Sequence, residues 1–322
     1  MISVAAVQQP SDYLNKNGCL ERAVGIIKKA AKESIELLVF PEGWIPGYPL
    51  FVWGLLPSSD PGELDQIYRR HFSNSIDLSK NQLAPIREAA REYGIVVVMC
   101  INERAGELSS GTIYNTAVTI DATGEILNVH RKVMPTNAER TVWGFGDGRG
   151  LNVVDTVVGR VGVLLCWENF MPLARAALYA QNVEIYCAPT ADPRENWLAS
   201  MQHIGREASA FVIGVAPALK DSDIPPDLPS RESISPTKGE WLMPGNGIIC
   251  SPLGEVIAGP MRNETGFLKA NVDLEDVYSA RRSFDVVGHY SRPDIFKLEV
   301  DRSPRSPVAF VDPEISKQKP RG

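Results

Sequence analysis

Apolar runs alternate with amphipathic stretches through the first third of the chain. The apolar runs are short and rich in β-branched residues, which favours strands, whereas the amphipathic stretches repeat their apolar positions with a helical period. The run GIVVVMCIN is too apolar for a strand with one face in water, so we expect it in the interior of a sheet. Strands are predicted at 2–8, 36–40 and 94–102, and helices at 21–34, 62–74 and 82–93.

The alternation continues through the rest of the chain, with a hairpin near its middle. Ala122-Thr123-Gly124 separates two strand-like runs, and its glycine can adopt the positive φ of a tight turn. Strands are predicted at 112–121, 125–132, 159–166, 183–190, 210–216, 246–250, 255–259 and 266–274, and helices at 171–182 and 194–209. This order favours an α/β fold with a mixed, largely buried sheet, and two packed sheets with helices outside also fit it.

The length of 322 residues lies near the size at which a single hydrophobic core stops growing. Residues 217–245 are too long and too proline-rich for a simple connector, so an insertion or an interaction loop is expected there. The end of the chain is polar and punctuated by prolines. We therefore expect one domain over 1–300 and a C-terminal tail over 301–322, either ordered against a neighbour or flexible.

Composition excludes several classes of function. The chain has 33 basic and 39 acidic residues, a net charge of −6 and no basic block, so nucleic acid is not an expected partner. No stretch approaches the length of a membrane span, and the amino terminus lacks the features of a signal peptide, so we expect no membrane partner and a cytoplasmic location. The five cysteines form no C-x-x-C pair and the four histidines show no metal-binding spacing, so we expect free thiols and no metal site.

Three residues of complementary chemistry follow predicted strands. Glu42 comes just after one strand, and Lys132 and Cys166 end two others. Ligands bind at the carboxyl ends of strands in sheets that carry helices on their faces. A cysteine thiol becomes a strong nucleophile when a nearby ammonium lowers its pKa and a carboxylate accepts its proton. The three residues therefore predict a site in which a cysteine attacks a polarised carbon.

The segments around these residues resemble the nitrilase branch of the carbon-nitrogen hydrolase superfamily. VFPEGWIPGYP carries Glu42, HRKVMPTNAERTVWGFGDG carries Lys132, and LLCWENFMPLARAALYAQ carries Cys166. Glu139, in the second segment, matches another glutamate that the family places beside the lysine and the incoming water. The segment GHYSRPDIF near the end of the chain is also typical of nitrilases. The chain departs from the family at two places. It has EASA at 207–210 where the family often has Glu-Gly-Arg-Cys, and it has Val215 where the family has a further cysteine.

The resemblance implies a four-layer α-β-β-α sandwich with mixed sheets. It implies hydrolysis of a nitrile to a carboxylic acid and ammonia through thioimidate and thioester intermediates on Cys166, with Lys132 and the backbone N–H of Trp167 stabilising negative charge. No cofactor or metal is implied. Tyr48 and Trp167 are the strongest candidates for contact with the substrate, because they stand closest in sequence to the proposed catalytic residues.

The family relationship also implies a homo-oligomer, a dimer that can extend into a spiral filament. The candidate dimer surface is formed by the predicted helices at 171–182 and 194–209. Further contacts between subunits are expected at segments 55–70 and 217–245. Two other functions stay open: an amidase or carbamoylase with the same triad, and a catalytically inactive, filament-forming member. The sequence does not distinguish aliphatic, aryl and arylaliphatic nitriles.

Overall fold

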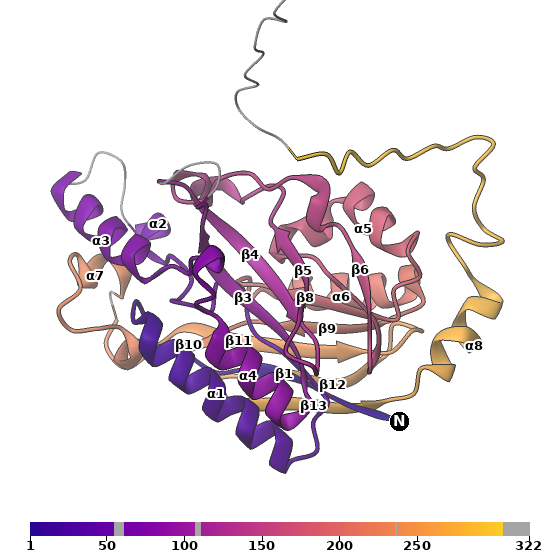
Figure 1. The fold of residues 1–322 in the computed structure, drawn as a ribbon, viewed down its shortest axis with the longest axis horizontal. Coiled ribbons are helices and arrows are strands. Elements are labelled where there is room, and N and C mark those ends of the chain that lie inside the picture. Colours follow the sequence, from indigo (N-terminus) through magenta and orange to yellow (C-terminus); the bar gives the residue numbers. More distant parts are fainter. Residues whose placement is uncertain (55–60, 107–110, 236, 305–322) are drawn as a thin grey trace, which may run out of the picture.

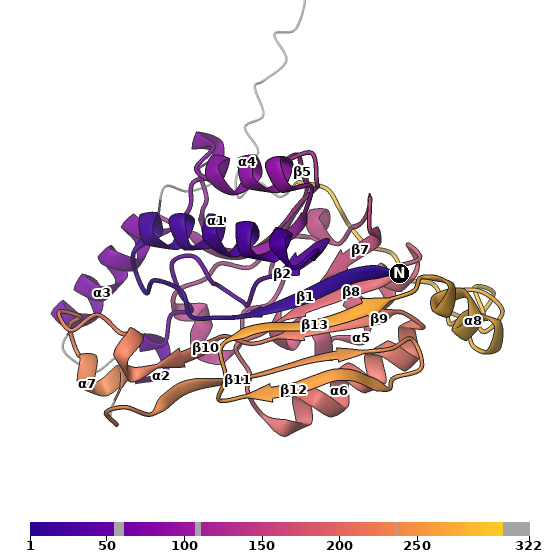
Figure 2. The ribbon, with the colours of Figure 1, turned by 90° about the horizontal axis from the view of Figure 1, so that it is seen from below.

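Two β-sheets lie face to face in the computed structural model, with helices on the outer side of each (Figure 1; Figure 2). The structure describes residues 1–54, 61–106, 111–235 and 237–304. Part of the predicted tail, 305–322, and part of a predicted contact region, 55–60, lie outside the described residues.

The first sheet mixes parallel and antiparallel strands. Its central strands β1, β2 and β3 are parallel, and β13, β4 and β5 add antiparallel pairs at the two sides. In spatial order the strands are β13 (Gly266–Val272), β1 (Ile2–Gln8), β2 (Leu37–Val39), β3 (Val96–Arg104), β4 (Ile113–Ile120) and β5 (Ile126–Arg131).

The second sheet is also mixed. Strands β7, β8 and β9 are parallel, while β6 and the long strand β11 pair in the antiparallel sense. In spatial order the strands are β10 (Ala218–Lys220), β11 (Trp241–Cys250), β9 (Phe211–Val215), β8 (Ile185–Pro189), β7 (Gly159–Val163) and β6 (Val153–Thr156), and β12 (Val256–Arg262) pairs with β11.

Four helices cover the outer faces. Helices α1 (Lys16–Lys32) and α4 (Ala84–Tyr93) pack on the first sheet, and α5 (Pro172–Tyr179) and α6 (Glu195–Ala208) pack on the second. The other helices are α2 (Phe51–Gly54), α3 (Pro61–Asn74), α7 (Arg231–Ile234) and α8 (Glu275–Ser283), and the short 3₁₀ turns are η1 (Leu78–Lys80), η2 (Asn137–Thr141), η3 (Gly148–Gly150), η4 (Cys166–Phe170) and η5 (Asp221–Asp223).

Strand β3 shows why its sequence is apolar throughout. Val98 and Cys100 point into the core between the sheets, whereas Val97 and Met99 point into the core beneath α1 and α4. Because successive side chains of a strand point to opposite faces, a strand buried on both faces has no polar alternation. The predicted α-β-β-α sandwich is confirmed.

Three local features depart from the sequence-based expectations. Residues 217–245 are not one irregular loop, because they contain β10, α7 and the start of β11. Strand β6 is a short edge strand that the pattern did not reveal. Helix α8 was also missed, because only Val277 and Ala280 of its residues are buried, which leaves it without a clear apolar period. No helix of the described residues is long and apolar enough to cross a membrane.

Ile213 on β9 tests the core between the two sheets, where its side chain is fully buried. Replacing Ile213 with alanine should lower the free energy of unfolding by about 2–5 kcal/mol, because it removes buried methyl groups and leaves a cavity. The matched control is Ile257→Ala on β12, whose side chain is 41% exposed and whose loss should change stability by about 0.5 kcal/mol or less. Urea unfolding followed by circular dichroism measures both. Equal, small effects in the two variants would contradict this description of the core.

Candidate active site

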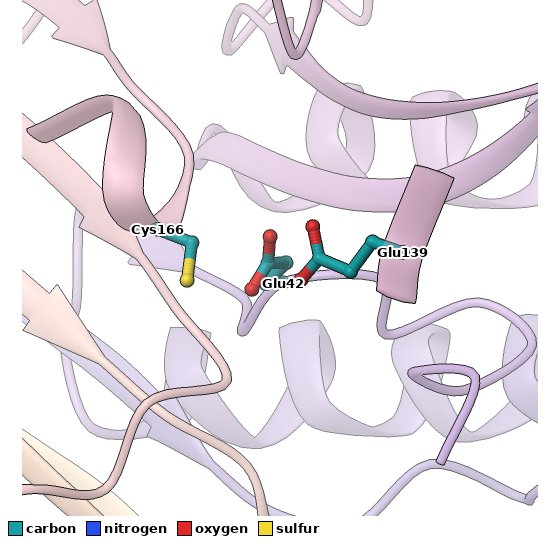
Figure 3. Close-up of side chains that lie close together, drawn as sticks. All are labelled: Glu42, Glu139 and Cys166. Atoms are coloured by element: carbon teal, nitrogen blue, oxygen red, sulfur yellow. The ribbon is translucent and has the colours of Figure 1, made fainter. Parts of the chain in front are cut away.

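Strand ends bring the predicted residues into one buried cluster. Glu42 lies just after β2, Lys132 directly follows β5, and Cys166 begins the η4 turn after β7. Glu139 joins them from η2. One ligand atom from each of Glu42, Glu139 and Cys166 lies within 4.8 Å of the others, and Figure 3 shows their side chains converging. The structure therefore brings together all four residues that the sequence singled out for chemistry.

Lys132 stands between the two carboxylates. Its Nζ donates to Glu42 Oε1 and to Glu139 Oε2, both at 2.7 Å, and all three side chains are almost completely buried. A buried charge is stable only when it is paired and hydrogen-bonded. Because the two carboxylates outnumber the single ammonium, the cluster has room for one more proton.

Hydrogen bonds from the scaffold fix both carboxylates. Asn115 Nδ2 on β4 donates to Glu42 Oε1 at 2.7 Å. Glu139 accepts hydrogen bonds from the Tyr48 hydroxyl at 2.8 Å and the Thr136 backbone N–H at 2.7 Å. The other oxygen of Glu42, Oε2, is buried and has no hydrogen-bond partner among the described residues. That oxygen is the one free to accept a proton.

The electrostatics of Cys166 differ from the expectation that the lysine would lower its pKa. Burial raises the pKa of the Cys166 thiol, and the Glu42 carboxylate raises it further, which together outweigh the opposite effect of Lys132. The resting sulfur is therefore a thiol and not a thiolate. The sequence-based expectation was wrong on this point because it took account of the ammonium but not of the dehydrated surroundings.

The two acid–base partners of the thiol have shifted pKa values of their own. Burial raises the pKa of Glu42 above its ordinary value, although Lys132 acts in the opposite direction. Burial acts to lower the pKa of Lys132, but the neighbouring Glu42, Cys166 and Glu139 raise it well above its ordinary value. Lys132 therefore stays an ammonium, while Glu42 is a stronger base than an exposed glutamate.

Glu168, which the sequence analysis did not single out, connects the nucleophile turn to the lysine segment. Its Oε2 accepts the backbone N–H of Leu165 at 2.7 Å, and its Oε1 accepts the backbone N–H of Val133 at 2.7 Å. His130 Nε2 lies 2.9 Å from Glu168 Oε2. One carboxylate thus fixes the residues adjacent to Cys166 and Lys132. Its sequence signal was an acidic residue in a turn that follows a buried strand.

The glycine-rich connection over 143–150 packs against the end of β5. The backbone N–H of Gly146 donates to Lys132 O at 2.8 Å, and a Cβ atom at Gly146 would lie 2.1 Å from Arg131 O. A side chain does not fit there. Gly146 therefore allows the close packing of this connection beside Lys132.

Trp143 contacts Lys132, and Asn102 contacts both Trp143 and the loop that follows Glu42. The Trp143 ring centroid lies 5.7 Å from Lys132 Nζ, and its Nε1 donates to Asn102 Oδ1 at 2.7 Å. Asn102 Nδ2 lies within 3.1–3.2 Å of three backbone oxygens in the loop that follows Glu42. Asn102 therefore ties the loop of Glu42 to the aromatic ring that faces Lys132.

A cavity of about 410 Å³ gives access to Cys166 and Glu139. Tyr48 and Trp167 line it, as the sequence analysis predicted, and so does Trp53. The other walls combine apolar and polar side chains, from Leu50, Ala191, Pro193, Leu242 and Met243 and from Thr136, Asn137, Asp192 and Arg194. Trp197 lies in the core beneath the second sheet and not at the cavity.

The donor set Glu42, Glu139 and Cys166 is close enough to hold a metal ion. However, the Lys132 ammonium already stands within hydrogen-bond distance of both carboxylates. A metal cation at the same place would be repelled by this ammonium. The arrangement suits transfer of a proton from the thiol to Glu42 and stabilisation of negative charge by Lys132.

Comparisons with known proteins agree with this geometry. The family model described as carbon-nitrogen hydrolase matches residues 3–282. Nitrilase 3 of Arabidopsis thaliana is 39% identical over 314 residues, covering 96% of this chain and 90% of the relative. The aliphatic nitrilase of Sinorhizobium fredii is 39% identical over 306 residues, covering 95% of this chain and 96% of the relative.

Solved structures share the fold at lower identity. The carbon-nitrogen hydrolase from Helicobacter pylori G27 is similar with a TM-score of 0.70 and 19% identity, covering 92% of this chain and 96% of that one. An amidase from Nesterenkonia sp. is similar with a TM-score of 0.61 and 17% identity, covering 88% and 94%. With its family model spanning most of its length and relatives near 39% identity, the chain belongs to the carbon-nitrogen hydrolase family.

Proposed function

We propose that the protein is a nitrilase that hydrolyses an organic nitrile to the carboxylic acid and ammonia. The observation that carries this proposal is the buried cluster of Cys166, Glu42 and Lys132 beside a cavity that Cys166 lines, in a chain whose relatives named nitrilases match nearly its whole length. The roles of the individual residues given below are part of the proposal.

Attack on the nitrile begins with transfer of the thiol proton. Glu42 Oε2 takes the proton from Cys166 Sγ, and the sulfur electron pair forms the bond to the nitrile carbon. Negative charge develops on the nitrile nitrogen, where the Lys132 ammonium and the backbone N–H of Trp167 stabilise it. Glu42 then gives the proton it took from the thiol to that nitrogen, which yields a neutral thioimidate on Cys166 and restores the Glu42 carboxylate. Because the resting sulfur is a thiol, the raised pKa of Glu42 helps the first transfer.

Hydrolysis then uses the same base twice. Glu42 accepts a proton from a water that attacks the thioimidate carbon, and ammonia leaves after its nitrogen is protonated. A second water attacks the resulting thioester, which releases the carboxylic acid and restores the Cys166 thiol. Glu139 holds Lys132 in place throughout, and the Tyr48 hydroxyl keeps Glu139 in position.

The walls of the cavity suit an apolar nitrile. Its volume of about 410 Å³ and its lining by Trp53, Leu242 and Met243 leave room for an aromatic or a branched aliphatic substituent. We further propose that residues 1–300 act as one domain, and that the protein works in the cytoplasm as a homo-oligomer. Leu173 on α5 is 67% exposed and Phe170, at the end of η4 just before α5, is 37% exposed, which supports a contact at the predicted dimer surface.

Loss of the nucleophile tests the proposed chemistry. Cys166→Ala should lower the rate of ammonia release from a panel of aliphatic, aryl and arylaliphatic nitriles by at least about 10³-fold, because no other group replaces the attacking sulfur. Cys187→Ala is the matched control, since Cys187 is equally buried but lies in the core between the sheets. Two results would contradict the proposal: unchanged ammonia release in the Cys166 variant, or no ammonia release by the wild-type protein from any nitrile.

The pH dependence tests Glu42 as the base. Glu42 acts only when ionised, and its pKa is raised, so kcat/KM should fall with acid at a pH above the ordinary range of a glutamate. Asn115→Ala removes a hydrogen bond that lowers the pKa of Glu42, so the acidic limb should move upward by about one pH unit. Asn128→Ala, a buried asparagine on β5 that bonds Gly150 O, is the control. A folded Asn115 variant with an unmoved acidic limb argues against this base.

Size-exclusion chromatography with light scattering tests the oligomer. The wild-type protein should elute as a dimer or larger, and Leu173→Asp should yield a smaller species, because it places a charge on an apolar contact. Val157→Asp is the control, because the Val157 side chain is 71% exposed in the turn between β6 and β7, outside the predicted contact segments, and this change should leave the size unchanged. A wild-type protein that is strictly monomeric contradicts the proposal.

A further inference from the structure

A second loop approaches the nucleophile from the second sheet. Thr190 directly follows β8, and its side chain is completely buried. Its backbone N–H donates to Val215 O at 2.8 Å, which ties the start of the loop to the neighbouring strand β9. The Thr190 hydroxyl oxygen lies 3.2 Å from Cys166 Sγ.

The Thr190 hydroxyl oxygen has a second partner. The backbone N–H of Asp192 donates to Thr190 Oγ1 at 2.9 Å. Because that N–H occupies one of the two lone pairs of the oxygen, the O–H group stays available to donate to the sulfur. An accepted hydrogen bond also polarises the O–H group and makes it a better donor.

Asp192 fixes the loop at a second point beside the nucleophile. Its Oδ2 accepts a hydrogen bond from Trp167 Nε1 at 2.9 Å, and Trp167 is the residue that follows Cys166. Arg194 pairs with the same carboxylate and lies over the Trp167 ring at 5.0 Å from its centroid. The loop and the η4 turn are therefore held together at two points, Thr190 to Cys166 and Asp192 to Trp167.

We propose that Thr190 is a further catalytic residue, whose hydroxyl donates a hydrogen bond to Cys166 Sγ and stabilises the thiolate during attack on the substrate. The inference rests on the proposed role of Cys166 as the nucleophile. The proton of the thiol goes to Glu42 Oε2, the sulfur electron pair forms the new bond to carbon, and the O–H bond of Thr190 stays intact. The same hydrogen bond assists again when the sulfur leaves as a thiolate from the thioester.

The benefit arises because a hydrogen bond to a charged acceptor is stronger than one to a neutral acceptor. The hydroxyl therefore stabilises the thiolate more than the resting thiol, and only such a difference accelerates a reaction. The hydrogen bond from Thr190 is among the influences that lower the pKa of Cys166, against burial and Glu42, which raise it. The expected benefit is about tenfold in the amount of thiolate at a given pH.

The test compares Thr190→Val with Thr190→Ser. Valine keeps the shape of threonine without the hydroxyl, and serine keeps the hydroxyl without the methyl group. The rate of alkylation of Cys166 by iodoacetamide, followed by mass spectrometry of the peptide that contains Cys166, reports the thiolate at each pH. We expect the rate constant at a fixed neutral pH to fall about tenfold in Thr190→Val and to stay near wild type in Thr190→Ser. The kcat/KM for a nitrile should change in parallel.

Several outcomes would overturn the inference. If the folded Thr190→Val protein is alkylated at the rate of the wild type, the hydroxyl does not stabilise the thiolate. Equal losses in the valine and serine variants assign the effect to packing. Thr190→Ala provides a second variant without the hydroxyl if the valine variant does not fold, and it is expected to lose the same tenfold.

Alkylation does not depend on nitrile hydrolysis, so it separates the inference from the proposed function. Wild-type protein without activity on any nitrile would count against the proposed function, while the alkylation rates would still decide the role of Thr190.

Discussion

The site depends on one buried interaction, the ammonium of Lys132 held between the carboxylates of Glu42 and Glu139 at 2.7 Å from each. None of these charges could remain ionised alone in so dry a place. Removing the Lys132 ammonium would leave both carboxylates uncompensated in the interior, and breaking a buried ion pair in this way costs roughly 3–5 kcal/mol. The triple therefore stabilises its own geometry, and it keeps the buried positive charge of Lys132 near the sulfur of Cys166.

The fold supplies what this interaction needs. Both sheets contribute, because Glu42 and Lys132 follow strands of the first sheet and Cys166 follows a strand of the second. The packed core between the sheets thus sets the distance between Glu42 and Cys166. Glu168 adds a direct connection, since its carboxylate binds the backbone on both sides. A rigid frame of this kind positions reacting groups before substrate arrives, which is the main source of catalysis by proximity.

The sequence predicted much of this arrangement, and its failures have physical causes. Glu42, Lys132 and Cys166 could be found because each follows an apolar run, and Glu139 because its segment resembles a known family. Asn115, Thr190 and Glu168 act through contacts with residues distant in the sequence, which no local pattern reveals. The sequence also predicted the wrong direction for the shift in the pKa of Cys166, because that shift depends on burial, which three-dimensional packing determines.

The central claim is that the sulfur of Cys166, activated by Glu42 and Lys132, forms a covalent bond to the nitrile carbon. Acid quenching during turnover, followed by mass spectrometry of the peptide that contains Cys166, tests it most directly. The account predicts a peptide heavier by the full mass of the nitrile, as a thioimidate requires. Turnover of the nitrile with no adduct at Cys166, or with the adduct on another residue, would contradict it.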